Sequence, residues 1–254
     1  MKVKFLGTGT STGVPEIGCK CEVCTSEDIR DRRLRASVLV SDGDKRVLID
    51  CGPDFRQQIL TEEFRAIDAV LLTHEHYDHV GGIDDLRPFC RFGDVDVYTN
   101  EQTSDALKRR IEYCFAETKY PGVPNLNLHT VQSFDKPFLA GGVDVLPISL
   151  FHAHLPIVGY RIRNFAYLTD VKLIPETEFD KLKDLDTLII SALRIEEHLS
   201  HLTLNDALAY IRQIAPKKAY LIHMSHQFGR HASVQSKLPS NVFISYDGLE
   251  IEVE

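Results

Sequence analysis

The sequence predicts a mixed α/β fold, because strand-like and helix-like segments alternate along its 254 residues. Short runs rich in Val, Ile, Leu and aromatic residues, most of them bounded by Gly, Asp or Asn, indicate strands in both halves of the chain. Helical patterns lie between several of these runs, which is typical of α/β proteins. The sequence contains no evident linker, low-complexity stretch or internal repeat, so a single domain over residues 1–254 is expected.

The predicted elements follow one another at short intervals. The clearest helix is expected from Leu204 to Ala215, because Thr203 can cap its start, apolar residues recur on one face and Pro216 ends it. Weaker helical patterns cover Gln102–Tyr113 and Pro175–Leu182. The predicted strands, in chain order, are Lys2–Leu6, Ser37–Val40, Arg46–Ile49, Ala69–Leu72, Val95–Tyr98, Val143–Ile148, Tyr160–Ile162, Phe165–Leu168, Thr187–Ile190, Ala219–Ile222 and Leu249–Val253.

Composition and charge exclude several classes of protein. Hydrophobic residues are 43% and charged residues 26% of the chain, close to the average of soluble globular proteins. The apolar runs are far shorter than the ~18 residues of a membrane helix, and the first run stops at Gly7, too early for a secretory signal. We therefore expect a cytoplasmic protein with no membrane partner. The net charge of −8, without a basic run, also disfavours long nucleic acids as partners.

A cluster of metal-binding residue types follows the predicted strand Ala69–Leu72. The segment reads Thr73-His74-Glu75-His76-Tyr77-Asp78-His79. His74 and His76 alternate with Glu75, so both can face one metal ion if the strand end stays extended. Asp78 and His79 then belong to the turn, where they can face a second ion. Imidazole and carboxylate ligands suit zinc, manganese or iron, so the segment predicts a metal centre.

The pattern His74-x-His76-x-Asp78-His79 resembles the signature of the metallo-β-lactamase-type hydrolases. Four further segments resemble the other motifs of that family, in the family's order and over almost the full length of the chain. They are Leu48-Ile49-Asp50-Cys51-Gly52, His152-Ala153-His154-Leu155-Pro156-Ile157-Val158-Gly159-Tyr160, Tyr167-Leu168-Thr169-Asp170 and Leu221-Ile222-His223. The resemblance implies a four-layer αββα sandwich, the metallo-β-lactamase fold, with the site at one edge of the two sheets.

The resemblance also implies a ligand set for two divalent ions, zinc or manganese. One ion would take His74, His76, His152 and Asp170, and the other would take Asp78, His79, His223 and the same Asp170. Asp50 would lie behind these ligands and orient them through hydrogen bonds. One position stays open, because His152 and His154 both precede Gly159 at a plausible distance. The longer spacing of His152 fits the family better.

A second cluster contains thiols. Cys19, Cys21 and Cys24 lie too close together for a convenient disulfide, and a cytosolic chain keeps its thiols reduced. Three thiolates lack one ligand for a closed tetrahedral zinc site. His226, three residues after His223, is the candidate fourth ligand. We therefore expect one structural zinc ion that fastens the N-terminal loop to the rim of the active site.

Together, these features resemble one branch of the family, the phosphonate-operon phosphoribosyl cyclic phosphate phosphodiesterases. The resemblance rests on the segment Gly7–Pro15, the cysteine cluster and His223-x-x-His226-Gln227-Phe228. It implies hydrolysis of a small phosphodiester, cyclic ones included, by a hydroxide shared between two metal ions. In that branch a histidine shortly before a Leu-Asn helix start protonates the leaving group or holds the phosphate, and His201 matches it. His201 and the ligand Asp78 are therefore the expected catalytic residues.

Other activities remain open on the same ligand set. A thioester or lactone hydrolase could use the same two ions. A ribonuclease Z-like nuclease is disfavoured, because the chain shows no long basic, Gly/Pro-rich insertion. A non-catalytic metal-binding carrier similar to pyrroloquinoline-quinone biosynthesis protein B would share the cysteine cluster. The expected partner is a small-molecule substrate, and a homodimer stays open because dimers are the commonest oligomers.

Overall fold

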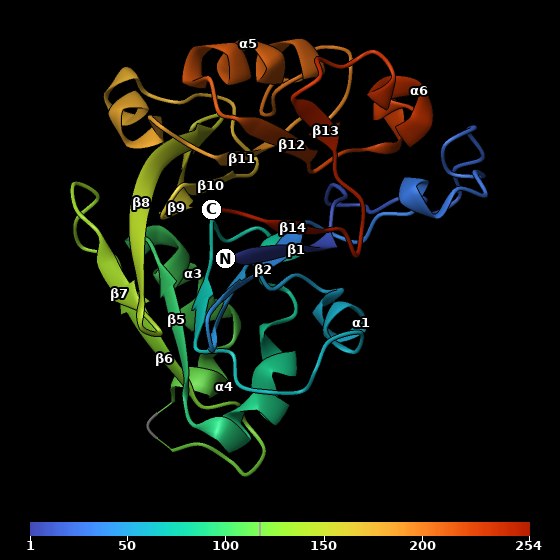
Figure 1. The fold of residues 1–254 in the computed structure, drawn as a ribbon. Coiled ribbons are helices and arrows are strands. Elements are labelled where there is room, and N and C mark those ends of the chain that lie inside the picture. Colours follow the sequence, from blue (N-terminus) through green and yellow to red (C-terminus); the bar gives the residue numbers. More distant parts are fainter. Residues whose placement is uncertain (117) are drawn as a thin grey trace.

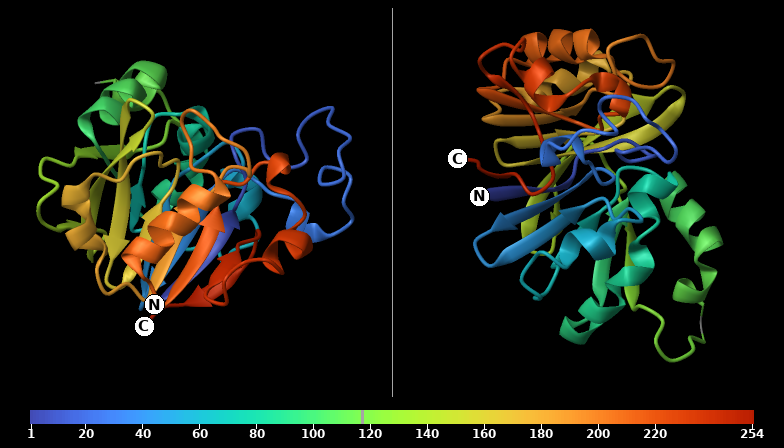
Figure 2. Two further views of the ribbon diagram at one scale, coloured as in Figure 1. Left: turned by 90° about the horizontal axis from the view of Figure 1, so that it is seen from above. Right: turned by 90° about the vertical axis from the view of Figure 1, so that its right-hand side faces the viewer.

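The computed structural model describes residues 1–116 and 118–254, in which two seven-stranded sheets pack face to face and helices cover both outer faces (Figure 1). The right-hand view of Figure 2 shows the four layers in sequence, from the helices at the top to the helices at the bottom. The predicted αββα sandwich is confirmed.

The first sheet contains the N-terminal half of the chain and its last strand. Its central and outer strands β3 to β6 run parallel, whereas β14, β1, β2 and β3 pair antiparallel. In sheet order the strands are β14 (Glu250–Glu252), β1 (Lys2–Gly7), β2 (Ser37–Asp42), β3 (Lys45–Ile49), β4 (Ala69–Leu71), β5 (Val95–Thr99) and β6 (Leu126–Thr130).

The second sheet is built in the same way from the C-terminal half. Strands β10 to β13 run parallel, and β7 to β10 pair antiparallel. In sheet order the strands are β13 (Val242–Ile244), β12 (Lys218–Ile222), β11 (Thr187–Ser191), β10 (Phe165–Leu168), β9 (Leu155–Ile162), β8 (Val143–His152) and β7 (Phe138–Ala140).

The helices are short and lie outside the sheets. The α-helices are α1 (Phe55–Ile59), α2 (Tyr77–Val80), α3 (Glu101–Arg110), α4 (Glu112–Phe115), α5 (Leu204–Ile214) and α6 (His231–Gln235). Segments of 3₁₀ helix cover Ile29–Asp31, Ile83–Phe92, Glu176–Leu182 and His226–Phe228. Within residues 1–116 and 118–254, no helix is long and apolar enough to cross a membrane.

Apolar side chains fill the spaces between the layers. Between the sheets lie fully buried aromatic residues, among them Phe5, Tyr160 and Tyr167. The strands β4, β10 and β11 are buried at every position, because each is covered on both faces. The outer face of the first sheet packs against Phe55 and the 3₁₀ segment Ile83–Phe92, and that of the second sheet packs against α5.

Helix α5 forms as its sequence predicts. Thr203 and Asp206 make a reciprocal capping box, in which the Thr203 hydroxyl accepts from the Asp206 amide and the Asp206 carboxylate accepts from the Thr203 amide. Ala207, Ile211 and Ile214 are buried against the sheet. The helix stops at Ala215, which adopts a left-handed conformation before Pro216.

The structure also corrects several expectations. The expected helix Gln102–Tyr113 is divided into α3 and α4, because Ile111 leaves the helical region with φ −127° and ψ 49°. The expected helix Pro175–Leu182 is a 3₁₀ segment. The strands β6, β7 and β13 were not expected, since β7 and β13 are short and β6 has a polar exposed face.

The topology brings the ends of several strands to one edge of the sandwich. The parallel strands β3, β4, β10 and β12 all end there, and so do β1 and β8, which run in the same direction within their sheets. The two sheets also bond to each other at this edge: the Val158 amide donates to the Thr73 carbonyl, and the Tyr160 hydroxyl donates to the Leu72 carbonyl. Side chains that follow these strands therefore meet.

Candidate metal centre

Several residues at this edge have an unusual backbone. Asp50, Asp170 and His223 follow β3, β10 and β12 and have φ values of 64°, 54° and 60°. The left-handed region costs a non-glycine residue about 1–3 kcal/mol, and such strain concentrates at functional sites. Here the turn redirects the chain after each strand. Asp50 and Asp170 then both contact His79, and His223 contacts Asp170.

Asp170 lies at the centre of two groups of side chains. On one side, His74 Nε2 lies 3.0 Å from His76 Nδ1 and 3.7 Å from Asp170 Oδ2. The His152 ring lies 5.2 Å from the His76 ring, between centroids. These four residues are those expected for the first ion. Ligand atoms of His74, His76 and Asp170 lie within 4.8 Å of one another, whereas His152 forms such a group with Asp170 and His201.

The residues expected for the second ion also converge. His79 Nε2 lies 3.1 Å from Asp78 Oδ2 and 3.4 Å from Asp170 Oδ2. His223 Nε2 lies 3.0 Å from Asp170 Oδ1 and 3.3 Å from Asp78 Oδ2. One potential ligand atom of each of these four buried residues lies within 4.8 Å of the others. Asp78 and His79 lie in the short helix α2 rather than in an open turn.

The hydrogen bonds of three histidines leave one ring nitrogen of each for a ligand. Nδ1 of His79 donates to Asp50, and Nδ1 of His152 donates to the carbonyls of Asp170 and Ser200. Nδ1 of His74 lies 3.0 Å from the Thr73 hydroxyl, which itself donates to Asp50. When the ring is neutral, each of these contacts fixes the tautomer in which Nε2 carries the lone pair.

The cluster fits a pair of divalent ions. His79 Nε2 is buried and makes no hydrogen bond, although two carboxylates lie nearby. A buried polar atom without a partner is costly, and a bound cation would supply the missing partner. The donors are imidazole nitrogens and carboxylate oxygens, which suit zinc and manganese.

Charges and burial within the cluster shift the pKa values of its residues. Burial alone would lower the pKa of His79, but the carboxylates of Asp78, Asp170 and Asp50 outweigh it and hold that pKa well above its usual value. Burial alone would raise the pKa of Asp170, but His223 and His79 hold it well below its usual value. Burial and the neighbouring His79 lower the pKa of His74, so this ring is neutral and able to bind a metal.

Asp50 lies behind the ligands, as expected. It is fully buried, and its Oδ2 accepts from His79 Nδ1 at 2.7 Å. Its Oδ1 accepts from the Thr73 amide at 2.9 Å. A carboxylate that holds a metal-binding histidine in this way fixes the ring and increases its basicity.

The structure distinguishes His152 from His154. His152 is buried at the end of β8, whereas His154 is exposed in the β8–β9 turn and belongs to no ligand cluster in the described part of the chain. The His201 ring lies 4.5 Å from the His152 ring and 5.2 Å from the His223 ring, between centroids, and one of its nitrogens lies within 4.8 Å of ligand atoms of His152 and Asp170. Burial lowers the pKa of His201 to about 3, and its Nδ1 has no hydrogen-bond partner.

The cysteine cluster forms as a separate group. Cys19 Sγ and Cys21 Sγ each lie 3.3 Å from His226 Nδ1, and Cys24 completes a set of four ligand atoms within 4.8 Å of one another. The thiols are free and partly exposed. A hydrogen bond from the Cys24 amide lowers the pKa of Cys21 to about 6, whereas burial raises that of Cys24 to about 12.

A short backbone connection joins the two clusters. The Thr10 amide donates to the Met224 carbonyl, and the Met224 amide donates to the Thr8 carbonyl. Met224 lies between His223 of one cluster and His226 of the other. The N-terminal loop, blue at the right of Figure 1, is therefore fixed next to the metal centre, as the cysteine cluster predicts.

Sequence reasoning missed two residues that support the clusters. Thr73 bonds both Asp50 and His74, and its place directly before His74 was a usable signal. Glu16 Oε2 lies 3.3 Å from His226 Nε2, on the side of the ring away from the thiols. More than two hundred residues separate Glu16 from His226 in the chain, so no local pattern could indicate this pair.

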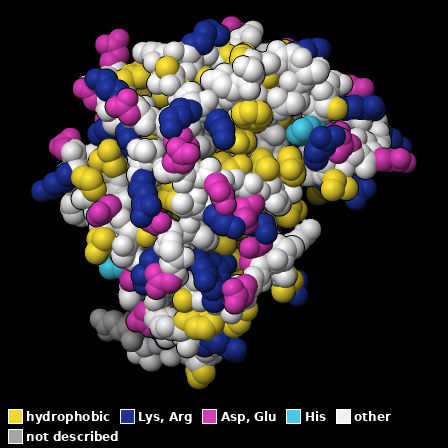
Figure 3. Space-filling model, in the orientation of Figure 1, with side chains coloured by type: hydrophobic (Ala, Val, Ile, Leu, Met, Phe, Trp, Pro, Cys, Tyr) yellow, Lys and Arg dark blue, Asp and Glu magenta, His cyan; other side chains and the backbone are white. Residues whose placement is uncertain are grey.

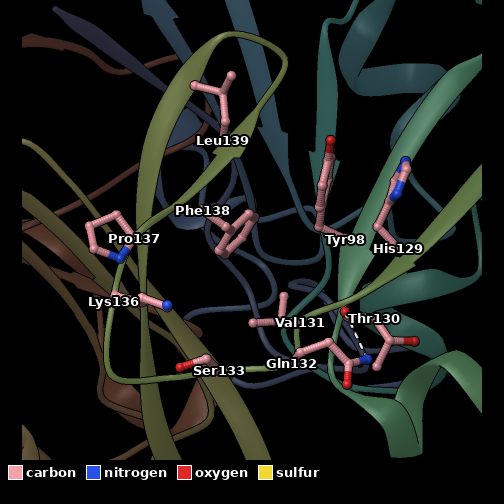
Figure 4. Close-up of a pocket in the computed structure, with 10 residues that line it drawn as sticks. All are labelled: Tyr98, His129, Thr130, Val131, Gln132, Ser133, Lys136, Pro137, Phe138 and Leu139. Carbon is pink, nitrogen blue, oxygen red and sulfur yellow. Dashed lines mark hydrogen bonds between the residues drawn. The ribbon is translucent and has the colours of Figure 1, made fainter.

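A surface pocket elsewhere contains none of these ligands. It has a volume of about 310 Å³ and lies between β5, β6 and the loop that leads into β7 (Figure 4). The Tyr98 ring stacks on His129 at 4.6 Å and on Phe138 at 5.3 Å, between centroids. The aromatic rings thus pack against one another rather than around a metal site.

Comparisons with known proteins agree with this geometry. A model of the beta-lactamase superfamily domain matches residues 45–224. A crystal structure described as a new diphosphatase from the PhnP family is 38% identical and superposes with a TM-score of 0.92. The match covers 100% of this chain and 98% of that chain. Zn²⁺-bound PqqB from Methylobacterium extorquens is 20% identical with a TM-score of 0.81 over 100% of each chain, which shows the fold alone.

One curated relative is longer. A Porphyromonas gingivalis protein named octanoyltransferase is 46% identical over 256 residues, which are 100% of this chain and 52% of that protein. The chain therefore spans about half the length of this relative.

Proposed function

The chain belongs to the β-lactamase superfamily, and from this premise we propose that it is a two-metal hydrolase of small phosphodiesters in the PhnP branch. The observation that carries the proposal is the orientation of His74 and His79. Their Nδ1 atoms contact Thr73 and Asp50, and their Nε2 atoms lie 3.7 and 3.4 Å from Asp170 Oδ2. The 38% identity to a PhnP-family diphosphatase supports a substrate with a phosphorus–oxygen bond to be cleaved.

The proposed ligand set is the one implied by the sequence. One ion would be held by His74, His76, His152 and Asp170, and the other by Asp78, His79, His223 and Asp170. When bound, two such cations lower the pKa of a water molecule toward ~7 and neutralise the charge of a phosphate group. Zinc or manganese is proposed, because both accept imidazole and carboxylate ligands.

The chain's own residues would orient the reaction. Asp170 directs one oxygen toward His223 and the other toward His74 and His79, so it can serve both halves of the site. Asp78 shares its Oδ2 between His79 and His223, which fixes the second half. His201 lies beside both halves, and its neutral ring can donate an N–H to the leaving oxygen. A bound phosphate would raise the pKa of His201 and favour full proton transfer.

We also propose a structural zinc ion at Cys19, Cys21, Cys24 and His226. Four protein ligands close a tetrahedral zinc site and leave no position for water. This ion would hold the N-terminal loop beside Met224 and would take no part in the chemistry.

The proposed partner is a small molecule rather than a long nucleic acid. The net charge is −8, and on the face in Figure 3 basic and acidic side chains are interspersed instead of forming a basic stripe. Recognition of a long phosphate backbone would need such a stripe.

A second candidate is hydrolysis of an acyl thioester. The match to the relative named octanoyltransferase covers 100% of this chain and 52% of the relative, and the name of that protein motivates testing a substrate that carries an acyl group. Two metal ions and a water molecule could cleave a thioester as well as a phosphodiester.

A substrate panel with metal analysis tests the proposal. The purified protein is assayed with bis-p-nitrophenyl phosphate, a five-membered cyclic phosphodiester, a nucleoside diphosphate and octanoyl thioesters, while metals are counted by elemental analysis. We expect two catalytic ions, one zinc ion at the cysteines and the highest kcat/KM on the phosphodiesters. A preference for thioesters would favour the second candidate, and no turnover with all ions bound would favour a non-catalytic carrier.

A further inference from the structure

The histidine that would act on the leaving group lies in a loop closed upon itself. Residues 192–203 connect β11 to α5, and the part between Arg194 and Leu202 carries both His198 and His201. The two ends of this segment are joined, because the Leu193 amide donates to the Leu202 carbonyl and the Leu204 amide donates to the Arg194 carbonyl. The loop therefore has fixed ends, and the position of His201 depends on what holds its interior.

Three carbonyl groups near His201 are held by side chains from outside the loop. Lys172 Nζ donates to the His198 carbonyl at 2.8 Å and to the His201 carbonyl at 3.1 Å. His152 Nδ1 donates to the Ser200 carbonyl at 2.9 Å. Backbone carbonyls need donors when they are withdrawn from water, and an ammonium group provides up to three.

Lys172 belongs to the segment that carries the central carboxylate. It lies two residues after Asp170, and its amide donates to the Phe151 carbonyl at 2.7 Å, next to His152. The neighbouring Val171 carbonyl accepts from the Leu202 amide. Asp170, His152 and Lys172 therefore lie on two bonded segments. The Lys172 ammonium group connects these segments to the loop through its hydrogen bonds to the loop carbonyls.

We propose that Lys172 is a positioning residue that sets His201 against the metal centre. This inference rests on the proposed function, since that function gives His201 its role. The ammonium group bridges the carbonyls of His198 and His201, so it fixes the backbone on both sides of Ser200. A hydrogen bond between a charged donor and a carbonyl is stronger than a neutral one, and therefore suits this task.

Another cation holds the outer part of the same loop and offers a comparison. The Arg194 guanidinium donates to the carbonyls of Glu196 and Glu197 and to Gln227 Oε1. These contacts lie away from the His201 carbonyl. Lys183 is a second comparison, because its side chain is 69% exposed and pairs only with Asp180 among the described residues.

The test compares Lys172→Met, Lys172→Arg and Lys183→Met in the full chain with its metals bound. For Lys172→Met we expect turnover to fall about 10- to 100-fold, the cost of misplacing a reacting group by about 1 Å, while KM and metal content stay unchanged. Lys172→Arg should recover part of the turnover, and Lys183→Met should match the wild type. Arg194→Met should cost less turnover than Lys172→Met.

Two further measurements separate this role from general stability. Amide hydrogen exchange should become faster at residues 198–202 in Lys172→Met and stay unchanged in α5. In a His201→Ala background, Lys172→Met should cause no further loss of turnover. If Lys172→Met does not fold, Lys172→Gln replaces it, because the amide retains N–H donors without charge.

Several outcomes would overturn the inference. Wild-type turnover together with wild-type exchange in Lys172→Met would remove the positioning role, and so would an additive loss in the His201→Ala background. Loss of the catalytic metals in Lys172→Met would assign the residue to the metal site instead. If the wild type hydrolyses no substrate of the panel, the proposed function fails, while the exchange of residues 198–202 still decides whether Lys172 holds the loop.

Discussion

The two ligand clusters of this chain differ in burial, in donor type and in the elements that carry them. The cluster around Asp170 is mostly buried, combines imidazole with carboxylate and lies at the ends of strands from both sheets. The cysteine cluster is partly exposed, combines thiols with one imidazole and lies mainly in the N-terminal loop. A rigid site whose ions share a ligand is suited to catalysis, whereas a site closed by four protein ligands in a loop is suited to stabilising that loop.

The clusters also differ in how their residues are distributed along the chain. Three of the four residues in the cysteine cluster lie between positions 19 and 24, whereas the other cluster draws on segments from Asp50 to His223. The cysteine cluster therefore needs only one short segment and one distant residue, His226. The other cluster requires both sheets to be assembled, so its integrity reports on the whole fold.

The largest effect is expected from Asp170→Ala. Because Asp170 faces both halves of the buried cluster, the variant should lose both catalytic ions and its turnover should fall by at least about 10³-fold, more than the 10- to 100-fold typical of residues behind the ligands. The zinc at the cysteines should remain. Elemental analysis and turnover are the measurements, and a fully metallated, active variant would contradict the shared role of Asp170.

A large effect on turnover alone is expected from His201→Ala. The variant should keep both catalytic ions and lose about 10²- to 10⁴-fold in turnover, the usual contribution of a general acid. The exposed His154 supplies the matched control, and His154→Ala should match the wild type. Equal turnover of His201→Ala and the wild type would remove His201 from the reaction.

For Cys24→Ser we expect loss of the zinc ion at the cysteines and retention of the ions at Asp170. One zinc ion per chain should be lost and the midpoint of thermal unfolding should fall, since binding a structural zinc contributes to folding. The ions at Asp170 should be retained, with turnover reduced through the Met224 connection rather than abolished. Cys90→Ser is the control outside the cluster. An unchanged zinc content in Cys24→Ser would refute the structural site.

The residues behind the ligands allow a matched comparison. Asp50→Asn should weaken metal binding at the buried cluster about 10- to 100-fold, because the fully buried carboxylate holds His79 at 2.7 Å. Glu16→Gln should weaken zinc binding at the cysteines less, because Glu16 is 41% exposed and lies 3.3 Å from His226. Competition with a chromophoric chelator measures both. A larger effect from Glu16 would reverse the proposed difference between the clusters.

The mildest effect concerns pH. The raised pKa of His79 means that this ring is protonated in the metal-free protein at neutral pH, so an entering ion must displace a proton. Metal affinity should therefore fall about tenfold per pH unit as pH decreases below that pKa, and become independent of pH above it. At the cysteines, Cys21 with a pKa of about 6 is already a thiolate at pH 7, whereas Cys24 at about 12 must release its proton.

Calorimetry in two buffers of different ionisation enthalpy checks this expectation. Proton release should accompany metal binding at both clusters. Binding without proton release at the Asp170 cluster would show that His79 is neutral before the ion enters.

Local signals predicted a mixed α/β fold, and the resemblance to the metallo-β-lactamase-type hydrolases implied the sandwich and the grouping of the distant ligand-type residues. Short apolar strands ended by His or Asp are visible in a single chain, and so are three neighbouring cysteines. The spacing favoured His152 over His154, and the structure buries the former and exposes the latter. The roles of these residues, the identity of the ions, the cytoplasmic location, the single domain and the homodimer stay predictions.

Other features depended on contacts between distant segments. Glu16 beside His226 and Lys172 beside the loop of His201 arise only when the sheets have assembled. The strands β6, β7 and β13 are short or have a polar face, so their pairing partners rather than their own sequences define them. The break between α3 and α4 at Ile111 interrupts a pattern that looks continuous in the sequence.

The ends of the chain lie side by side, as Figures 1 and 2 show, and the Met1 amino group donates to the Val253 carbonyl at 3.0 Å. Strand β1 begins at this end of the molecule. Its six extended residues span about 20 Å, and Thr8, directly after the strand, bonds Met224 next to the ligands. A tag, tether or fused module attached at either end would therefore leave the protein on the side opposite the edge that carries the metal-ligand residues. The same geometry suits circular permutation, with a short linker joining the old ends and new ends opened at the β2–β3 turn.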